Sequence, residues 1–366
     1  NGDINEPTNF GLSNTTDYTI TIRPDDDIPS VITFEQVADN GASSGNIIIG
    51  LPNINDWSSL GTAKNIIIDG FAPGGNTRQL TFQNISANAN TCKPIHIIGK
   101  IDNVVVKNCN LYDNTSGSSA FGVVSIRVRN SGGVDYIPNN ITIDNCIIKS
   151  TSNTAAGIFV SNSGTPVGRP VGLVFKNNFI EVLHRAVSLN YAGTSSVLNN
   201  EIKVNQTSSG MASFGIGGTS GGMVSTTISG NKILQLGTAN TTGAGNGIRA
   251  IQASAGGTWY IYNNFITGFA TPSTGTTEVL GIRVGSLSYV YNNTIVLNNT
   301  STTGGGTTPT GCIVTYSATS EFKNNILITN EDDFASYCSY GKAISDFNVF
   351  HLGGTNNAKT GFATIA

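Results

Sequence analysis

Four tyrosines with matched spacing are the clearest candidate binding residues in this chain of 366 residues. They occur as two Tyr-x-Tyr pairs, each directly before an Asn-Asn dipeptide: Tyr260, Tyr262, Tyr289 and Tyr291. Residues two apart on a strand point to the same face. If the two segments are neighbouring strands, the rings form a two-by-two patch beside Glu321 and Lys323, suited to the apolar face of a pyranose ring. The alternative is a tyrosine ladder that only stabilises the strand pairing.

Two arginines form the second candidate. Arg249 and Arg283 each follow a Gly-Ile dipeptide, which predicts equivalent positions on adjacent strands about 4.8 Å apart. Like charges at that separation are unfavourable unless an anion lies between them. The pair therefore indicates a subsite for a carboxylated or sulfated sugar. The alternative is that the side chains diverge into solvent or pair with a loop acid such as Glu278.

No catalytic residue can be assigned from the sequence. The histidines are isolated from one another along the chain: His96, His184 and His351. Two acidic runs, at 25–27 and 331–333, could hold Ca²⁺, but neither has the Asp-x-Asp-x-Asp-Gly spacing of a recognised loop. We expect no metal or other cofactor, with Ca²⁺ supported by no specific motif.

Five cysteines form no CxxC pair and no zinc-ligand spacing. They are Cys92, Cys109, Cys146, Cys312 and Cys338. The odd number leaves at least one free thiol, so cysteine usage does not decide the redox compartment.

The elements that must position these residues belong to an internal repeat. An apolar run, an Asn-Asn dipeptide or close variant, and an aliphatic residue recur along the chain. The copies begin at Asn108, Asn145, Asn177, Asn199, Gly230, Asn263, Asn292 and Asn324, with a weaker one at Asp69-Gly70-Phe71. The unequal intervals predict a constant coil with loops of variable length.

Two columns of the repeat are apolar in every copy. Two residues before the phrase stand Ile68, Val106, Ile143, Phe175, Val197, Ile228, Ile261, Val290 and Phe322. Three residues after its first position stand Leu111, Ile148, Ile180, Ile202, Ile233, Ile266, Ile295 and Leu327. This alternation is typical of strands with one buried face. Stacked coils explain why the same columns recur.

A second strand lies between the Asn phrases, and several of its copies read Gly-Ile-x-Val. Its copies are expected at 125–128, 157–160, 186–189, 247–250, 281–284 and 311–314, with a degenerate one at 215–217. Thr- and Gly-rich stretches at 207–222, 238–247, 270–277 and 300–310 precede this strand and are expected to be loops along one edge.

Together, these phrases resemble the repeat of pectate-lyase-like right-handed parallel β-helices over about residues 60 to 330. The resemblance implies an all-β fold, a single-stranded right-handed parallel β-helix (solenoid), with an internal Asn ladder at the second position of each turn. The ladder positions would be Cys109, Cys146, Asn178, Asn200, Asn231, Asn264, Asn293 and Asn325. Cys109 and Cys146 are then small buried thiols in place of Asn, or alternatively a disulfide.

Enzymes similar in fold cleave polysaccharides, so an enzyme must be considered. The lyases carry acidic Ca²⁺ ligands on the outward face of the strand that here reads Gly-Ile-x-Val, and the related hydrolases carry Gly-His-Gly. The predicted outward column here contains no carboxylate: Arg127, Phe159, Ser188, Gly217, Arg249, Arg283 and Ile313. No Gly-His-Gly occurs.

The ends differ from the repeat. We expect irregular first coils or a cap over 1–60, regular coils over 61–330, and a last coil with an extension over 331–366. The closing phrases at 324–328 and 345–350 are similar to those of repeat-rich bacterial surface proteins exported by type IX secretion. Asn1 is typical of a processed or trimmed start.

Composition narrows the function classes. Only 11% of residues are charged, and the net charge is −3. The sequence contains no basic stripe, so we expect no nucleic-acid partner. No apolar stretch is long enough to span a bilayer. We therefore expect a secreted, extracellular or cell-surface module, adhesin-like or glycan-binding and noncatalytic, whose partner is a polysaccharide or surface glycan. The alternative is a polysaccharide lyase or glycoside hydrolase with a diverged active site.

Overall fold

The structure is a computed structural model of the chain. It describes residues 4–6, 10–34, 47–50, 61–85, 93–114, 122–163, 165, 167–205, 213–218, 223–236, 247–269, 279–297, 311–317, 319–329, 335–339 and 344–352. Over these residues the regular secondary structure is entirely β. The chain divides into two compact units: unit 1 comprises Asn1–Val182 and Ser188–Ser196, and unit 2 comprises Leu183–Val187 and Val197–Ala366. The division falls within β18 (Arg185–Leu189) and β19 (Thr194–Leu198).

Unit 1 contains three parallel sheets, here called A, B and C. Sheet A runs β1 (Ile4–Glu6), β4 (Ser30–Phe34), β7 (Leu80–Asn84), β10 (Asn110–Asp113), β14 (Ile147–Ser150), β17 (Phe179–Val182). Sheet B runs β2 (Phe10–Leu12), β5 (Ile47–Ile49), β8 (Ile95–Ile98), β11 (Gly122–Ser131), β15 (Ala156–Ser163). Sheet C runs β3 (Ile20–Ile22), β6 (Thr62–Asp69), β9 (Lys100–Lys107), β13 (Pro138–Asp144), β16 (Leu173–Lys176). A short β12 (Val134–Tyr136) pairs antiparallel with β11.

Unit 2 also contains three parallel sheets, which carry the same letters. Sheet A runs β20 (Glu201–Val204), β23 (Lys232–Leu236), β26 (Phe265–Ile266), β29 (Thr294–Leu297), β32 (Ile326–Thr329), β35 (Val349–Leu352). Sheet B runs β21 (Ser213–Gly218), β24 (Ile248–Ala253), β27 (Val279–Val284), β30 (Gly311–Thr315), β33 (Ala335–Ser339). Sheet C runs β22 (Ser225–Ser229), β25 (Thr258–Tyr262), β28 (Ser288–Tyr291), β31 (Glu321–Lys323), β34 (Ile344–Asp346).

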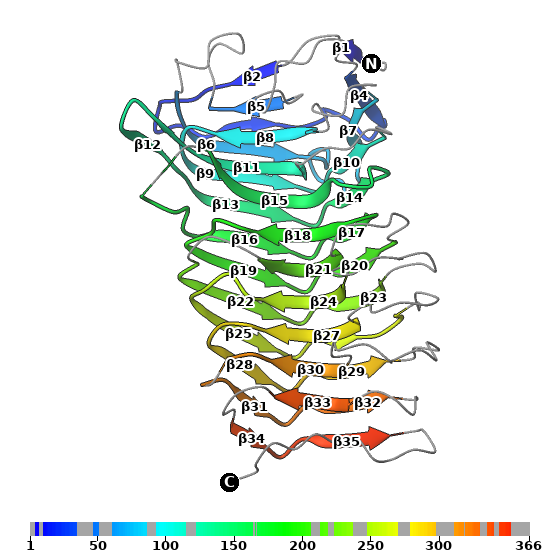
Figure 1. Cartoon of the computed structure of the whole chain (residues 1–366). Coiled ribbons are helices and arrows are strands. Elements are labelled where there is room, and N and C mark those ends of the chain that lie inside the picture. The colour runs from blue at the N-terminus through cyan, green and yellow to red at the C-terminus, as the bar shows by residue number, and fades with distance from the viewer. Residues whose placement is uncertain are drawn as a thin grey trace. The chain divides into compact units, whose positions relative to one another are not determined.

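Each coil contributes one strand to each sheet, as Figure 1 shows for β9, β10 and β11 and again for β28, β29 and β30. Within each unit, each strand of these sheets pairs in parallel with its equivalent in the next coil, as β10 does with β14 and β28 with β31. The prediction of a right-handed parallel β-helix is confirmed. The strand-like runs before residue 60 also join these sheets, since β3, β4 and β5 pair with β6, β7 and β8.

The predicted apolar columns form the interior of both units. Val106, Ile143 and Phe175 are register partners on β9, β13 and β16, and all three are fully buried. In unit 2, Ile228, Ile261 and Val290 are stacked in the same way. Because each coil buries its apolar side chains against the same column of the next coil, a core can form from few hydrophobic residues. This arrangement suits a chain with a hydrophobic content of only 38%.

An asparagine ladder fills the turn between sheets C and A in unit 2. Its members are at most 2% exposed: Asn200, Asn231, Asn264, Asn293 and Asn325. From Asn231 onward, the Oδ1 atom of each member accepts the backbone N–H of the member before it at 2.9–3.0 Å. Its Nδ2 atom donates to the adjacent sheet C carbonyl, as Asn264 does to Ile228 O at 3.0 Å. The predicted ladder is confirmed, and it continues to Asn348, which accepts from the Asn325 N–H at 2.9 Å.

The first residue of the turn has a different role from the ladder residue. Asn263, Asn292 and Asn324 have φ of 57°, 56° and 56°, and Gly230 has φ of 68° at the same position. A left-handed backbone costs most side chains about 1–2 kcal/mol, which Gly avoids and Asn tolerates. The first residue of the dipeptide is therefore favoured for its left-handed backbone, and the second for its ladder hydrogen bonds.

Cysteines replace asparagine in two ladder positions of unit 1. Cys109 and Cys146 are free thiols with no exposed surface, so the structure has the buried-thiol arrangement rather than the disulfide. The neighbouring Cys146 and burial both raise the pKa of the Cys109 thiol, which keeps it protonated. Cys312 is also buried and free, whereas the side chains of Cys92 and Cys338 lie outside the described part.

Restoring asparagine to the ladder is expected to stabilise the protein. The Cys146 Sγ lies 3.7 Å from Val106 O, a carbonyl that a ladder Asn would reach at about 3 Å. We expect Cys146→Asn to raise the free energy of unfolding by about 1–2 kcal/mol, measured as the urea midpoint by circular dichroism. Cys312→Asn is the control and should destabilise, because Cys312 lies in sheet B outside the ladder. A loss of stability in Cys146→Asn equal to that control would contradict the prediction.

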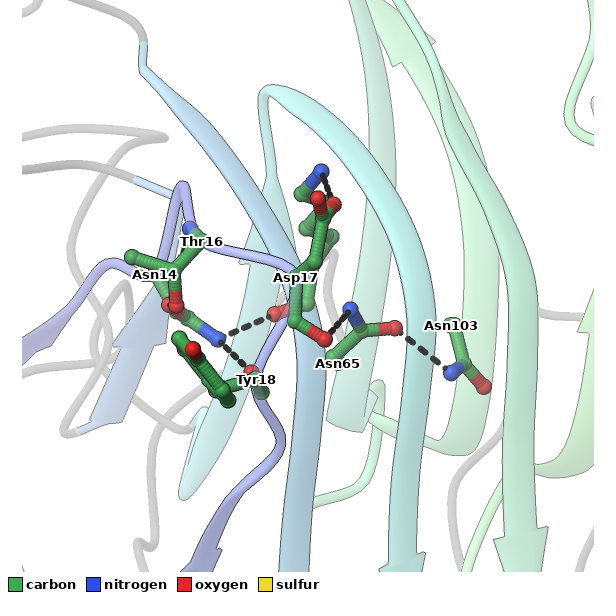
Figure 2. Close-up of polar contacts among 7 residues, drawn as sticks. Asn14, Thr16, Asp17, Tyr18, Asn65 and Asn103 are labelled. Carbon is green, nitrogen blue, oxygen red and sulfur yellow. Dashed lines mark hydrogen bonds and ion pairs between the residues drawn. The ribbon is translucent and has the colours of Figure 1, made fainter.

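A second left-handed column, which the phrases do not reveal, occurs in unit 1. Asn65, Asn103 and Asn140 have φ of 56°, 55° and 53° within β6, β9 and β13. Asn103 Nδ2 donates to Asn65 Oδ1 at 2.8 Å, and Asn65 Nδ2 donates to Asp17 O (Figure 2). Beside them, Asn14 Nδ2 donates to the carbonyls of Tyr18 and Lys64. These amides hold the segment before β3 against β6.

The sheets differ in how their outer faces are covered. Sheet C strands alternate between buried and partly exposed residues, as in β25 and β28. In sheet B, β8, β21 and β30 are buried on both faces. The strands β11, β24 and β27 of the same sheet have partly exposed residues, among them Arg127, Arg249 and Arg283.

Candidate functional site

The four tyrosines lie together on the outer face of sheet C in unit 2, and we call them the tyrosine patch. Tyr260 is the register partner of Tyr289, and Tyr262 is the register partner of Tyr291. The alternate residues, Trp259, Ile261 and Val290, point inward and are fully buried. The predicted two-by-two arrangement is therefore confirmed, although its binding role remains a prediction.

Two ring contacts organise the tyrosine patch. The Tyr260 and Tyr289 rings stack with centroids 5.4 Å apart and an interplanar angle of 14°. The Tyr289 and Tyr291 rings are tilted, with centroids 6.2 Å apart. Tyr260 is 41% exposed, so the stacked pair presents aromatic surface to solvent. Stacking already restricts the orientation of the two rings in the free protein. Binding a ligand therefore costs little additional side-chain entropy.

Polar groups border the tyrosine patch on both sides. Thr227 and Ser229 of β22 are the register partners of Tyr260 and Tyr262. Glu321 and Lys323 of β31 are the register partners of Tyr289 and Tyr291. An aromatic surface between hydroxyls and charged groups offers contacts for both the apolar face and the hydroxyls of a sugar.

Glu321 is held as a carboxylate. Tyr291 donates from its hydroxyl to Glu321 Oε2 at 2.7 Å, and Lys323 Nζ lies 3.0 Å from the same oxygen. The Tyr291 hydrogen bond, and then Lys323, hold the pKa of Glu321 below its ordinary value. Burial, and then Glu321, raise the pKa of Tyr291. The lowered pKa favours the ionised form of Glu321 at neutral pH, whereas the acid of a glycoside hydrolase has a raised pKa.

The arginine pair does not have the predicted register. Arg249 is the partner of Leu280, and Arg283 is the partner of Gln252, so the two arginines are not neighbours across the strands. The two Gly-Ile dipeptides begin 34 residues apart, at Gly247 and Gly281, whereas register partners on β24 and β27 are 31 residues apart. The sequence repeat misplaces Arg127 in the same way, since its partner is Ser161 rather than Phe159.

Each arginine instead has local contacts on sheet B. Arg249 Nη1 donates to Gln252 Oε1 at 2.8 Å. Arg283 Nη1 donates to Ser254 Oγ at 2.8 Å, and its guanidinium lies 4.7 Å from the centroid of the Tyr316 ring. Glu278, the acid considered as a partner, lies outside the described residues.

In the described part of the chain, no three His, Cys, Asp or Glu side chains gather as a metal ion would need. The acidic run at 25–27 belongs to that part, whereas the run at 331–333 lies outside it. Among the same residues, no helix has the length and hydropathy needed to cross a bilayer.

Comparisons with known proteins show similarity only among solved structures. No family model and no curated protein matches the sequence. The chain is similar to the crystal structure of PfbA, a surface adhesin of Streptococcus pneumoniae, with 15% identity and a TM-score of 0.46, covering 96% of this chain and 81% of that one. It is also similar to the GH136 lacto-N-biosidase from Eubacterium ramulus, with 9% identity and a TM-score of 0.36, covering 94% and 61%. Neither similarity assigns a family or an activity to this chain.

Proposed function

We propose that this protein is an extracellular or cell-surface module that binds a glycan through the tyrosine patch and does no chemistry on it. The stacked Tyr260–Tyr289 pair on the open face of sheet C carries the proposal. Its interplanar angle of 14° makes a nearly flat platform, which matches the apolar face of a pyranose ring better than a tilted pair would.

The surroundings of the tyrosine patch favour binding over catalysis. Glu321, the carboxylate beside it, accepts hydrogen bonds from Tyr291 and Lys323 and has a lowered pKa. A carboxylate in this state can accept hydrogen bonds from sugar hydroxyls but does not donate a proton. The low charged content of 11% and the polar composition support a surface location.

Truncating the stacked pair tests the proposal. We expect Tyr260→Ala with Tyr289→Ala to weaken binding of the best ligand from a neutral and acidic glycan array by about 30-fold or more, because each ring contributes about 1 kcal/mol or more. Isothermal titration calorimetry measures the change. The control is Phe265→Ala on sheet A of the same unit, since Phe265 is also 41% exposed.

Two outcomes would contradict the proposal. Unchanged affinity in the double variant would make the tyrosine patch a structural ladder. New reducing or unsaturated ends after incubation with the bound polysaccharide, with and without Ca²⁺, would show that the protein is an enzyme.

A further inference from the structure

One oxygen of the carboxylate beside the tyrosine patch has no hydrogen-bond partner among the described residues. Tyr291 and Lys323 both donate to Glu321 Oε2, at 2.7 Å and 3.0 Å, whereas Oε1 accepts no hydrogen bond there. The hydrogen bond from Tyr291, and then Lys323, hold the pKa of Glu321 below its ordinary value, which favours the carboxylate at neutral pH. The side chain of Glu321 is 26% exposed. Oε1 is therefore an anionic acceptor on a held side chain that solvent reaches.

This carboxylate lies directly beside the stacked rings. The strands β25, β28 and β31 are neighbours in sheet C (Figure 1). Glu321 is the register partner of Tyr289, and Tyr289 stacks on Tyr260. Register partners on neighbouring strands are separated by about 4.8 Å. A sugar ring that rests on the stacked pair therefore brings the hydroxyls at its rim beside Glu321.

The charged groups around the tyrosine patch are two carboxylates and one ammonium. The strands β22, β25 and β28 contain no charged residue. Next along sheet C, β31 contributes Glu321 and Lys323, and β34 contributes Asp346. Lys323 Nζ lies 3.0 Å from Glu321 Oε2, and Asp346 is the register partner of Lys323. The lysine is therefore already compensated, and an anionic ligand would meet an excess of negative charge.

We propose that the tyrosine patch binds neutral saccharides and rejects uronates and sulfated sugars, and that Glu321 sets this preference. The inference rests on the proposed glycan-binding function and names its ligand class. Glu321 Oε1 accepts a hydrogen bond from a hydroxyl of a neutral sugar, and a charged acceptor makes that bond about twice as strong as a neutral one. The same charge repels a carboxylate or sulfate ester on the ligand, because like charges at short separation are little screened. One side chain therefore strengthens the binding of one ligand class and weakens that of the other.

This preference is the opposite of the one that the arginine pair predicts from the sequence. A subsite for carboxylated or sulfated sugars needs Arg249 and Arg283 side by side, and the register of β24 and β27 does not place them so. Both arginines also lie on sheet B, whereas the tyrosine patch lies on sheet C. The charge that a ligand of the tyrosine patch meets is therefore that of β31 and β34.

Matched pairs of trisaccharides test the preference by isothermal titration calorimetry. The probes are cellotriose, β-mannotriose and β-galactotriose, each with the counterpart in which the C6 hydroxymethyl groups are oxidised to carboxylates. We expect at least one neutral probe to bind, and its oxidised counterpart to bind about tenfold more weakly or not at all at low salt. Added salt should narrow the difference, because it screens the repulsion. No binding of any neutral probe at millimolar concentration, or tighter binding of the oxidised counterparts, would overturn the proposal.

A charge-removing variant assigns the preference to one residue. Glu321→Gln should weaken the neutral probe by about tenfold and leave its oxidised counterpart equal or tighter, so that the preference falls to about threefold or less. Glu201→Gln is the matched control, since Glu201 of β20 also pairs with the lysine two residues later, at 3.8 Å, but lies on sheet A of the same unit. Circular dichroism confirms that each variant is folded. An equal change of preference in both variants would assign the effect to net charge and overturn the role of Glu321.

The tyrosine variant separates failure of this inference from failure of the proposed function. Tyr260→Ala with Tyr289→Ala should lose the neutral probe that the wild type binds. If that binding survives in the tyrosine variant, the patch is not the site, and both proposals are overturned. If the binding depends on the tyrosines but Glu321→Gln changes neither the affinity nor the preference, the glycan-binding function stands and only this inference is overturned.

Discussion

Replacing Asn264 by leucine is expected to destabilise the protein by about 2–5 kcal/mol, although the two side chains are similar in size. Asn264 Oδ1 accepts the Asn231 backbone N–H at 3.0 Å, and its Nδ2 donates to Ile228 O at 3.0 Å. Leucine can do neither, so two backbone groups in a turn without solvent lose a partner. Each buried group left without a partner costs about 1–3 kcal/mol.

The neighbouring residue provides the matched control for this prediction. Asn263 is exposed and has φ of 57°, and Gly230 occupies the same position one coil earlier. We expect Asn263→Gly to change stability by about 0.5 kcal/mol or less, because glycine also adopts this conformation. The urea midpoint by circular dichroism is the appropriate measure, since coils need not unfold in one step. If Asn264→Leu is no less stable than Asn263→Gly, the ladder does not stabilise the coil.

The features that could be predicted are those that every coil must satisfy. An inward position in a stacked coil favours an apolar side chain, so the columns through Val106 and Ile261 are apolar in the coils from β6 to β31. In the last coil, Ser345 of β34 takes this position beside Phe322. The Asn-Asn dipeptide is constrained twice, by the left-handed residue and by the ladder residue. Its last copy is hidden because Phe347 occupies the left-handed position before Asn348, with φ of 53°.

The features that could not be predicted depend on loop lengths. The Gly-Ile dipeptides before Arg249 and Arg283 look equivalent in the sequence. The number of residues between two dipeptides does not fix how their strands pair, so the sequence alone does not give the register of β24 and β27. By contrast, an apolar run such as Ile47–Ile49 on β5 does indicate burial on both faces.

The assignment of tyrosines and inward residues to opposite faces depends on the two-residue period of sheet C, and a pair of carboxylate substitutions tests that period directly. Ile143 is fully buried between Val106 and Phe175, whereas its neighbour Thr142 points outward and is partly exposed. We expect Ile143→Asp to cost about 5 kcal/mol or more, because it removes a packed side chain and buries an unpaired carboxyl group. Thr142→Asp should cost about 1 kcal/mol or less.

The pH dependence of Ile143→Asp distinguishes a buried carboxyl group from a simple packing defect. Burial raises the folded-state pKa of the new carboxyl above its unfolded value of about 3.9, so the native state binds the proton more tightly than the unfolded state. Relative to the wild type, the loss of stability should be smallest below about pH 4 and should grow as the pH rises toward the raised folded-state pKa. Urea midpoints at acidic and neutral pH measure this difference. If the two aspartate variants lose equal stability, or if the loss in Ile143→Asp does not change with pH, Ile143 does not face a solvent-free interior and the opposite placement of the tyrosines loses its basis.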